Sequence, residues 1–163
     1  MPILATDLAQ STSQISLTSV SNIGNQGTMK MSKIHFNDSQ PLMVKLSNGL
    51  DSEIPFEPSV YGGSPNGDEV RKTILLRVSD EIHEAFAALE EHCRTELEAD
   101  STPNVRQLWT SSIRSDQYGK SMRCKINMSG DRSCDFWNSD NDLTKAPPLK
   151  GLPVNAVIHV RGV

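Results

Sequence analysis

Regular alternation of apolar and polar residues predicts a chain built mainly from β-strands. The clearest stretch is 120–128, in which apolar residues such as Met122 alternate with Arg123 and Lys125. One face of this strand is therefore apolar and the other is basic. We expect it to form a hairpin with 133–137. The same pattern predicts strands over 28–36, with a change of phase near Ser32, and over 42–46, 70–78 and 154–160.

A single long helix is predicted after Ser79, which is a suitable N-cap. Asp80 and Glu81 would complement the positive end of the helix dipole. Pro103 ends the helical region, and a short further turn of helix is expected over 105–109. Apolar residues recur along the long helix at spacings of 4, 3, 4 and 4, as one stripe: Ile82, Phe86, Leu89, Cys93 and Leu97.

These elements follow one another as three strands, a long helix with a short second helix, and three further strands, in the order βββα(α)βββ. We therefore expect a mainly β protein of the α+β class, with a small antiparallel OB-like barrel. Residues 1–27 are rich in Ser, Thr and Gln without a sustained period, which indicates a flexible arm. Residues 28–163 would form a single β-rich domain. Within it, the Pro and Gly residues of 48–69 indicate a long loop without regular elements.

Charge is distributed unevenly along the 163 residues. Residues 1–100 carry 7 basic and 15 acidic side chains, a net charge of −8, whereas residues 101–163 carry 9 basic and 5 acidic ones, a net charge of +4. The C-terminal part can therefore face an anionic partner, although the whole chain has a net charge of −4. Eight of the acids lie between 80 and 100, where we interpret them as a solvated helix face.

Composition and the first residues limit the cellular setting. The apolar runs fall far short of the roughly 20 residues that span a bilayer, so no membrane span is expected. The N-terminal residues contain neither a basic region nor a long apolar one, which argues against secretion. Three Cys residues without a secretory signal indicate free thiols. We expect a location inside the cell, in the cytoplasm, the nucleus or a virus factory, or within a virion.

Motifs that would indicate catalysis or metal binding are incomplete. A zinc site needs four Cys or His ligands in paired spacing, and Cys124 with Cys134 would supply half of one. Residues 138–142 resemble the start of a calcium-binding loop, but Leu143 and Leu149 replace its required Gly and Glu. The glycines of 62–67 lack the Lys and Ser or Thr of a P-loop, and no nucleophile motif is present. We expect no enzymatic activity, no metal and no cofactor.

The candidate binding site lies in the second half of the chain, where aromatic residues are interspersed among basic ones. Arg and Lys side chains bind phosphates, while aromatic rings stack on bases without reading sequence. We expect Arg123, Lys125 and Arg161 to contact phosphates. Tyr118 and Trp137 would stack on bases. The full candidate set for nucleic-acid binding is Arg114, Tyr118, Lys120, Arg123, Lys125, Arg132, Trp137 and Arg161.

Four segments of this half carry a family resemblance: 105–109 (Val-Arg-Gln-Leu-Trp), 116–119 (Asp-Gln-Tyr-Gly), 122–126 (Met-Arg-Cys-Lys-Ile) and 149–163, which contains G-x-x-V-x-A-x-I-x-V-x-G. The chain resembles OB-fold, single-stranded-DNA-binding-like proteins of large DNA viruses and phages over these residues. The resemblance implies an OB-like barrel that binds single-stranded DNA. Members of that family continue with a further strand where this chain stops at Val163. We therefore expect the sheet edge to stay open or to be completed by another molecule.

Two functions follow as hypotheses. The first is a non-enzymatic protein that binds single-stranded nucleic acid through the basic, aromatic-interspersed face of a β-barrel. The second is a viral structural or scaffolding protein, a minor particle component whose N-terminal arm and C-terminal strand edge are ordered by a protein partner or by self-association. A plainer interpretation also stays open, in which Trp109 and Phe136 are core residues and the cations only keep strand exteriors soluble.

Overall fold

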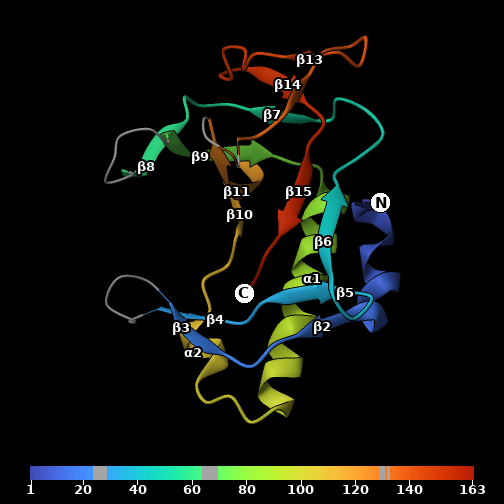
Figure 1. Ribbon diagram of the computed structural model, residues 1–163, viewed down its shortest axis with the longest axis vertical. Helices are drawn as coiled ribbons and strands as arrows, with labels where there is room; N and C mark the ends of the chain where they lie inside the picture. The colour runs from blue at the N-terminus through green and yellow to red at the C-terminus, as the bar shows by residue number, and fades with distance from the viewer. Residues whose placement is uncertain (24–28, 64–69, 129–130, 132) are drawn as a thin grey trace. The chain divides into compact units, whose positions relative to one another are not determined.

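A computed structural model describes residues 1–23, 29–63, 70–128, 131 and 133–163 (Figure 1). The fold belongs to the α+β class, because most elements are strands in several sheets and one helix is long. The chain divides into two compact units, whereas the sequence indicates a single domain over 28–163. Unit 1 comprises Met1–Gly49, Ser79–Ser111 and Asn155–Val163, and unit 2 comprises Leu50–Val78 and Ser112–Val154.

Unit 1 combines three helical segments with short strands. The helical segments are η1 (Ala5–Gln14, a 3-10 helix), α1 (Asp80–Ala99) and α2 (Val105–Leu108). The strands are β1 (Ile3–Leu4), β2 (Ile15–Leu17), β3 (Ser21–Ile23), β4 (Met29–Met31), β5 (Ile34–Phe36), β6 (Gln40–Lys45) and β15 (Val157–Val160). One sheet has the order β1-β6-β5-β2, with β15 also paired to β6, and β3 pairs with β4.

The long helix α1 begins where the sequence predicts. Ser79 is its N-cap, and the Ser79 Oγ accepts a hydrogen bond from the Ile82 N–H at 3.3 Å. The expected apolar stripe is buried from Ile82 to Leu97, and the predicted short helix is present as α2. In the part of the chain that the structure describes, no helix combines the length and the apolar character needed to cross a bilayer.

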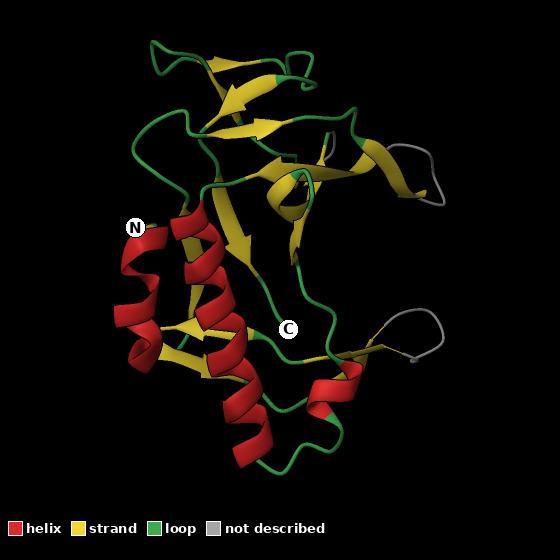
Figure 2. Ribbon diagram, turned by 180° about the vertical axis from the view of Figure 1, so that it is seen from behind, coloured by secondary structure: helices red, strands yellow, loops and turns green. Residues whose placement is uncertain are grey.

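The first residues of the chain form part of the core of unit 1, in contrast to the flexible arm expected over 1–27. η1 lies beside α1 (Figure 2), and the side chains of Ala5 and Leu8 are fully buried. The strands on either side of η1 pair with β6 and β5. The expectation was based on polar composition. A few widely spaced apolar residues, here Ala5 and Leu8, nevertheless suffice to bury one side of a short helical segment.

The C-terminal segment pairs within the same unit. β15 runs antiparallel to β6, with Ile158 opposite Val44, so the chain itself completes one edge of its terminal strand. Beyond β15, the Ser32 N–H donates to the Val163 carbonyl at 2.8 Å, and the Val163 N–H donates to the Ser32 carbonyl at 3.0 Å. Ser32 is fully buried between β4 and β5. The change of phase near Ser32 therefore corresponds to an interruption between two short strands.

Unit 2 consists of strands and connecting loops. The strands are β7 (Ser52–Ile54), β8 (Ser59–Gly63), β9 (Val70–Arg77), β10 (Ile113–Asp116), β11 (Gly119–Asn127), β12 (Phe136–Trp137), β13 (Leu143–Thr144) and β14 (Leu152–Val154). The main sheet has the order β10-β11-β9-β7-β14, and β8 pairs with β9. Among the described residues its outer strands β10 and β14 do not pair with each other, so the sheet is not closed into a barrel.

Two expectations for unit 2 are wrong. Residues 48–69 contain β7 and β8, although the sequence predicts no regular element there. The expected hairpin of 120–128 with 133–137 is also absent from the described residues, because β11 pairs with β10 on one edge and with β9 on the other. β12 pairs with β13 instead. Alternation of apolar and polar residues identifies the two faces of a strand, but it does not show which other strands pair with its edges.

Candidate nucleic-acid interface

Register places the basic side chains of three neighbouring strands on one face of the main sheet. Residues directly opposite each other in adjacent strands share a face, and successive residues alternate between faces. Arg123 lies opposite Leu75, and Lys125 lies opposite Thr73. Since Ser121 lies opposite both Arg77 and Arg114, all three strands contribute to this face. We call the following set the cationic face: Arg71 and Arg77 of β9, Arg114 of β10, and Arg123 and Lys125 of β11.

All five side chains of the cationic face are exposed to solvent. The opposite face of the same strands carries their buried apolar side chains, Ile74, Leu76 and Met122. This division into a buried apolar face and an exposed basic face is what the alternation in 120–128 predicts. The open basic face is therefore a surface that an anionic partner can reach.

Two carboxylates accompany the five cations. Glu53 of β7 pairs with Arg77, with 3.5 Å between the Arg77 Nη1 and the Glu53 Oε2. Asp116 is occupied locally, because its Oδ1 accepts a hydrogen bond from the Tyr118 N–H at 2.8 Å. Within the described residues, the guanidinium groups of Arg114 and Arg123 have neither an ion pair nor a hydrogen bond. The cationic face thus keeps a positive excess.

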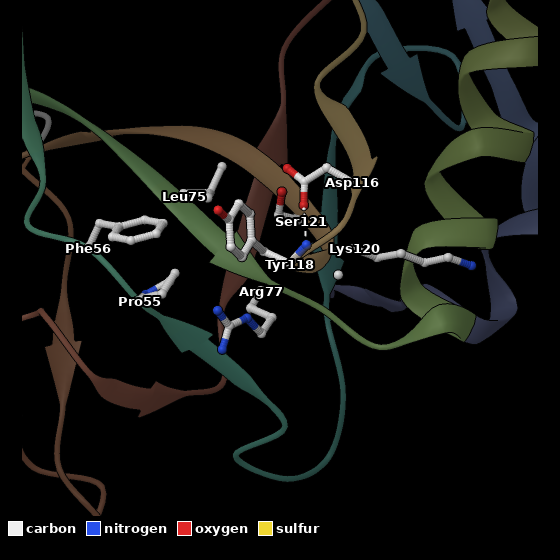
Figure 3. Close-up of a pocket in the computed structure, with 9 residues that line it drawn as sticks. Pro55, Phe56, Leu75, Arg77, Asp116, Tyr118, Lys120 and Ser121 are labelled. Atoms are coloured by element: carbon white, nitrogen blue, oxygen red, sulfur yellow. Dashed lines mark hydrogen bonds between the residues drawn. The ribbon is translucent and has the colours of Figure 1, made fainter.

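A shallow pocket opens beside the cationic face (Figure 3). Two exposed aromatic rings line it, Phe56 from the segment between β7 and β8 and Tyr118 from the turn between β10 and β11. The half-buried Leu75 and the Arg77 side chain come from β9. The remaining lining residues are Pro55, Asp116, Gly119, Lys120 and Ser121. The pocket therefore combines aromatic and aliphatic surface with the cations Arg77 and Lys120.

The structure brings together five of the eight residues that the sequence nominated. Arg114, Arg123 and Lys125 belong to the cationic face, and Tyr118 and Lys120 line the adjoining pocket. Lys120 alternates onto the opposite side of β11 from Arg123, and its side chain points away from the Tyr118 ring in Figure 3.

The other three nominated residues lie elsewhere. Trp137 is exposed, but it belongs to the separate two-stranded sheet of β12 and β13. Arg161 follows β15 in unit 1, so it shares no sheet with the cationic face. Arg132 lies outside the described residues. Of the two residues expected to stack on bases, Tyr118 lines the pocket beside the cationic face, and Trp137 belongs to a different sheet.

Sequence reasoning missed Phe56, Arg71 and Arg77. The alternation of 70–78 already places both Arg residues on the polar side of that strand. What the sequence lacks is the pairing of β9 with β11, which aligns the two polar sides over seven residue pairs from Ser121–Arg77 to Asn127–Arg71. Phe56 was passed over because it lies in the Pro- and Gly-rich stretch interpreted as a loop.

The division of charge into two sequence halves does not match the two units. Unit 2 contains 10 basic and 10 acidic residues, so its net charge is zero, and unit 1 contains 6 basic and 10 acidic residues. The positive character is therefore a property of one sheet face rather than of a whole half of the chain. Two of its five cations come from residues 1–100, the part with a net charge of −8.

Trp109 has a structural position in unit 1. The carboxylate of Glu90 is buried, and its Oε2 accepts hydrogen bonds from the Trp109 Nε1 at 3.2 Å and the Ser111 Oγ at 2.7 Å. The Arg94 guanidinium lies over the Trp109 ring, 5.0 Å from its centroid. These contacts attach the segment after α2 to α1. Apart from Glu90, the acids of α1 are exposed, as expected for a solvated helix face.

The cysteines and acids offer no metal site in the ranges that the structure describes, where no cluster of three or more His, Cys, Asp or Glu residues could hold an ion. Burial, with a further contribution from the nearby Glu90 carboxylate, raises the pKa of the Cys93 thiol to about 12. Burial likewise raises the pKa of the Cys124 thiol to about 12. Both thiols are therefore protonated at neutral pH, and Cys134 is the exposed one.

Neither protein-family models nor curated proteins nor solved structures contain a match to this chain. The resemblance in residues 105–163 is therefore carried by its motifs alone. Function has to be inferred from the cationic face and the pocket beside it.

Proposed function

We propose that this protein binds single-stranded nucleic acid, without enzymatic activity, through the cationic face of unit 2. The observation that carries the proposal is the convergence of five exposed cations from β9, β10 and β11 on one sheet face. Phosphate contacts by Lys and Arg dominate the affinity of proteins for nucleic acids. A surface of this kind binds through the release of counterions and needs no particular base sequence.

The spacing of the cations supports a flexible ligand. Residues two apart on a strand lie about 6.5 Å from each other, and neighbouring strands are about 4.8 Å apart. Arg123 and Lys125 are two apart on β11, while Arg114 lies on the next strand. The cations therefore form a two-dimensional array, which a single strand can follow by bending. The described residues of unit 2 include no helix that could enter the major groove of a duplex.

An OB-like arrangement stays part of this proposal. The main sheet has six strands among the described residues, five on the path β10-β11-β9-β7-β14 and β8 beside β9, whereas the OB-fold has five. The sheet is also open between β10 and β14, so the likeness concerns only the use of a sheet face for binding.

The viral structural role has less support. Its main motivation was an N-terminal arm and a terminal strand that need neighbouring subunits. In the described residues, η1 is packed against α1, and β15 pairs with β6 of the same chain. The cationic face is therefore the stronger basis for a function.

A labelled single strand of about 15 nucleotides, titrated with the full chain across a salt series, tests the proposal. We expect binding that weakens steeply with salt. The Arg123→Glu, Lys125→Glu double variant should lose it. A Lys30→Glu, Lys145→Glu double variant is the control, because it changes the net charge equally at exposed positions outside the cationic face. No binding at low salt, or equal loss in both variants, would contradict the proposal.

A further inference from the structure

We infer that the pocket between Phe56 and Tyr118 binds one unpaired nucleobase and makes the protein selective for single strands over duplexes. This inference rests on the proposed function, since it assigns a specific site next to the cationic face. Phosphate contacts do not by themselves exclude a duplex, because single strands and duplexes both carry phosphates. The pocket supplies this discrimination, because it can accept a base that is not paired.

Both rings are exposed to solvent, and the local backbone holds that of Tyr118 there. The Tyr118 side chain is 74% exposed and that of Phe56 is 59% exposed. Asp116 fixes the turn that carries Tyr118 by accepting its N–H, and Gly119 follows with a φ of +111°, which favours glycine. The ring of Tyr118 is thus presented by a tight turn between paired strands. Exposed aromatic side chains at the edge of a pocket provide surface for stacking.

The lining of the pocket matches the two parts of a nucleotide. Leu75 and Pro55 offer apolar surface to the flat face of a base. Arg77 can donate hydrogen bonds to a base oxygen or to the adjoining phosphate. The ion pair with Glu53 holds the Arg77 guanidinium near this position. An apolar lining that also contains cations suits a neutral base joined to an anionic backbone.

The pocket is continuous with the cationic face along the sheet. Ser121 lines the pocket and lies opposite Arg77 on β9 and Arg114 on β10, and Arg123 follows two residues later on the same side of β11. A strand with one base in the pocket can therefore extend its phosphates over Arg114 and Arg123. A base in a duplex is paired and stacked on its neighbours, so it cannot enter the pocket unless the duplex opens.

The test compares three ligands of equal length, about 15 nucleotides each: a poly-dT strand, a strand whose sugars lack bases, and a duplex. The wild-type chain should bind the poly-dT strand most tightly. Phe56→Ala and Tyr118→Ala should each weaken that binding by about 5- to 150-fold, the usual effect of removing a stacked aromatic ring. Trp137→Ala is the matched control, because Trp137 is 62% exposed in the same unit but does not line the pocket.

Three outcomes separate this inference from the proposed function. Binding of all ligands that is equally strong, and unchanged in Phe56→Ala and Tyr118→Ala, overturns the pocket and leaves binding by the cationic face intact. Weakening by Trp137→Ala to the same extent also overturns the assignment to this pocket. If no ligand binds at low salt, the proposed function itself fails, and the inference fails with it. Circular dichroism of each variant checks that the fold is retained.

Discussion

The guanidinium of Arg77 on β9 lies 3.5 Å from the carboxylate of Glu53 on β7, and both side chains are about half exposed. Arg77 belongs to the cationic face and also lines the pocket, so this ion pair reduces the positive charge where the two meet. Glu53 neutralises part of the charge of Arg77, and its carboxylate repels an approaching phosphate. The ion pair therefore orients Arg77 at the expense of some affinity for an anionic ligand.

Replacing Glu53 with Gln should raise the affinity for single-stranded nucleic acid. Exposed ion pairs contribute about 0.2–1 kcal/mol, so we expect up to about fivefold tighter binding at low salt. The gain should shrink at high salt because screening weakens the electrostatic attraction. Fluorescence anisotropy titrations at two salt concentrations measure the effect. Asp140→Asn, at an exposed position in the loop between β12 and β13, is the charge-matched control. Weaker binding by Glu53→Gln would mean that Arg77 needs its partner in order to bind.

Glu90→Ala should destabilise unit 1 by about 1–3 kcal/mol, because the Trp109 Nε1–H and the Ser111 hydroxyl lose the carboxylate that accepts their hydrogen bonds. Glu90→Gln should cost less, since both donors reach the same oxygen and an amide retains one acceptor. Chemical denaturation followed by tryptophan fluorescence measures both variants. Equal stability of Glu90→Ala and the wild type would show that this network contributes nothing.

Leu8→Ala tests the structural role of the first residues. Leu8 is fully buried in η1, so truncation of its side chain should destabilise the protein by about 2–5 kcal/mol. Gln10→Ala, at an exposed position in the same segment, should have little effect. Urea denaturation of the two variants provides the comparison. If Leu8→Ala is as stable as Gln10→Ala, the first residues of the chain do not contribute to the stability of the fold.

Acid should weaken the contact between α2 and α1. Hydrogen bonds from Arg106 and then Arg94 lower the pKa of the Glu91 carboxyl from 4.5 to about 2. A carboxyl with a lowered pKa in the folded state stabilises that state above pH 4.5, and this contribution is lost as the pH falls towards 2. Glu91→Gln should therefore unfold with a shallower pH dependence than the wild type in that window. Thermal melts at a series of pH values measure it, and parallel curves would refute the assignment.

The elements of this fold were predictable where one segment determines its own structure. The N-cap at Ser79, the apolar stripe from Ile82 to Leu97 and the two faces of β11 are all set by residues close in sequence. Pairing between distant segments was not predictable in this way. Residues 70–77 and 119–127 show clear alternation, yet nothing in either stretch identifies the other as its neighbour.

In the candidate site, too, residues whose position depends on local sequence were predictable, and residues whose position depends on strand pairing were not. Arg123 and Lys125 were found because their own strand alternates, and Tyr118 because it is an aromatic residue among basic ones in the sequence. Arg71, Arg77 and Phe56 were missed because only the pairing of β9 with β11 and β7 brings them to the same surface. Trp137 was selected for its residue type and its proximity in sequence to basic residues, but the sheet to which it belongs is a different one.

The salt dependence of binding tests the central claim most directly. Each phosphate contact to a single strand contributes about 0.7 to the slope of log K against log salt concentration. Arg114 and Arg123 are exposed cations without a partner among the described residues, so both can contact phosphates. The Arg114→Gln, Arg123→Gln double variant should therefore show a slope smaller by about 1.4 than that of the wild type. An unchanged slope would contradict the account, because it would show that nucleic acid contacts neither Arg114 nor Arg123, at the centre of the proposed interface.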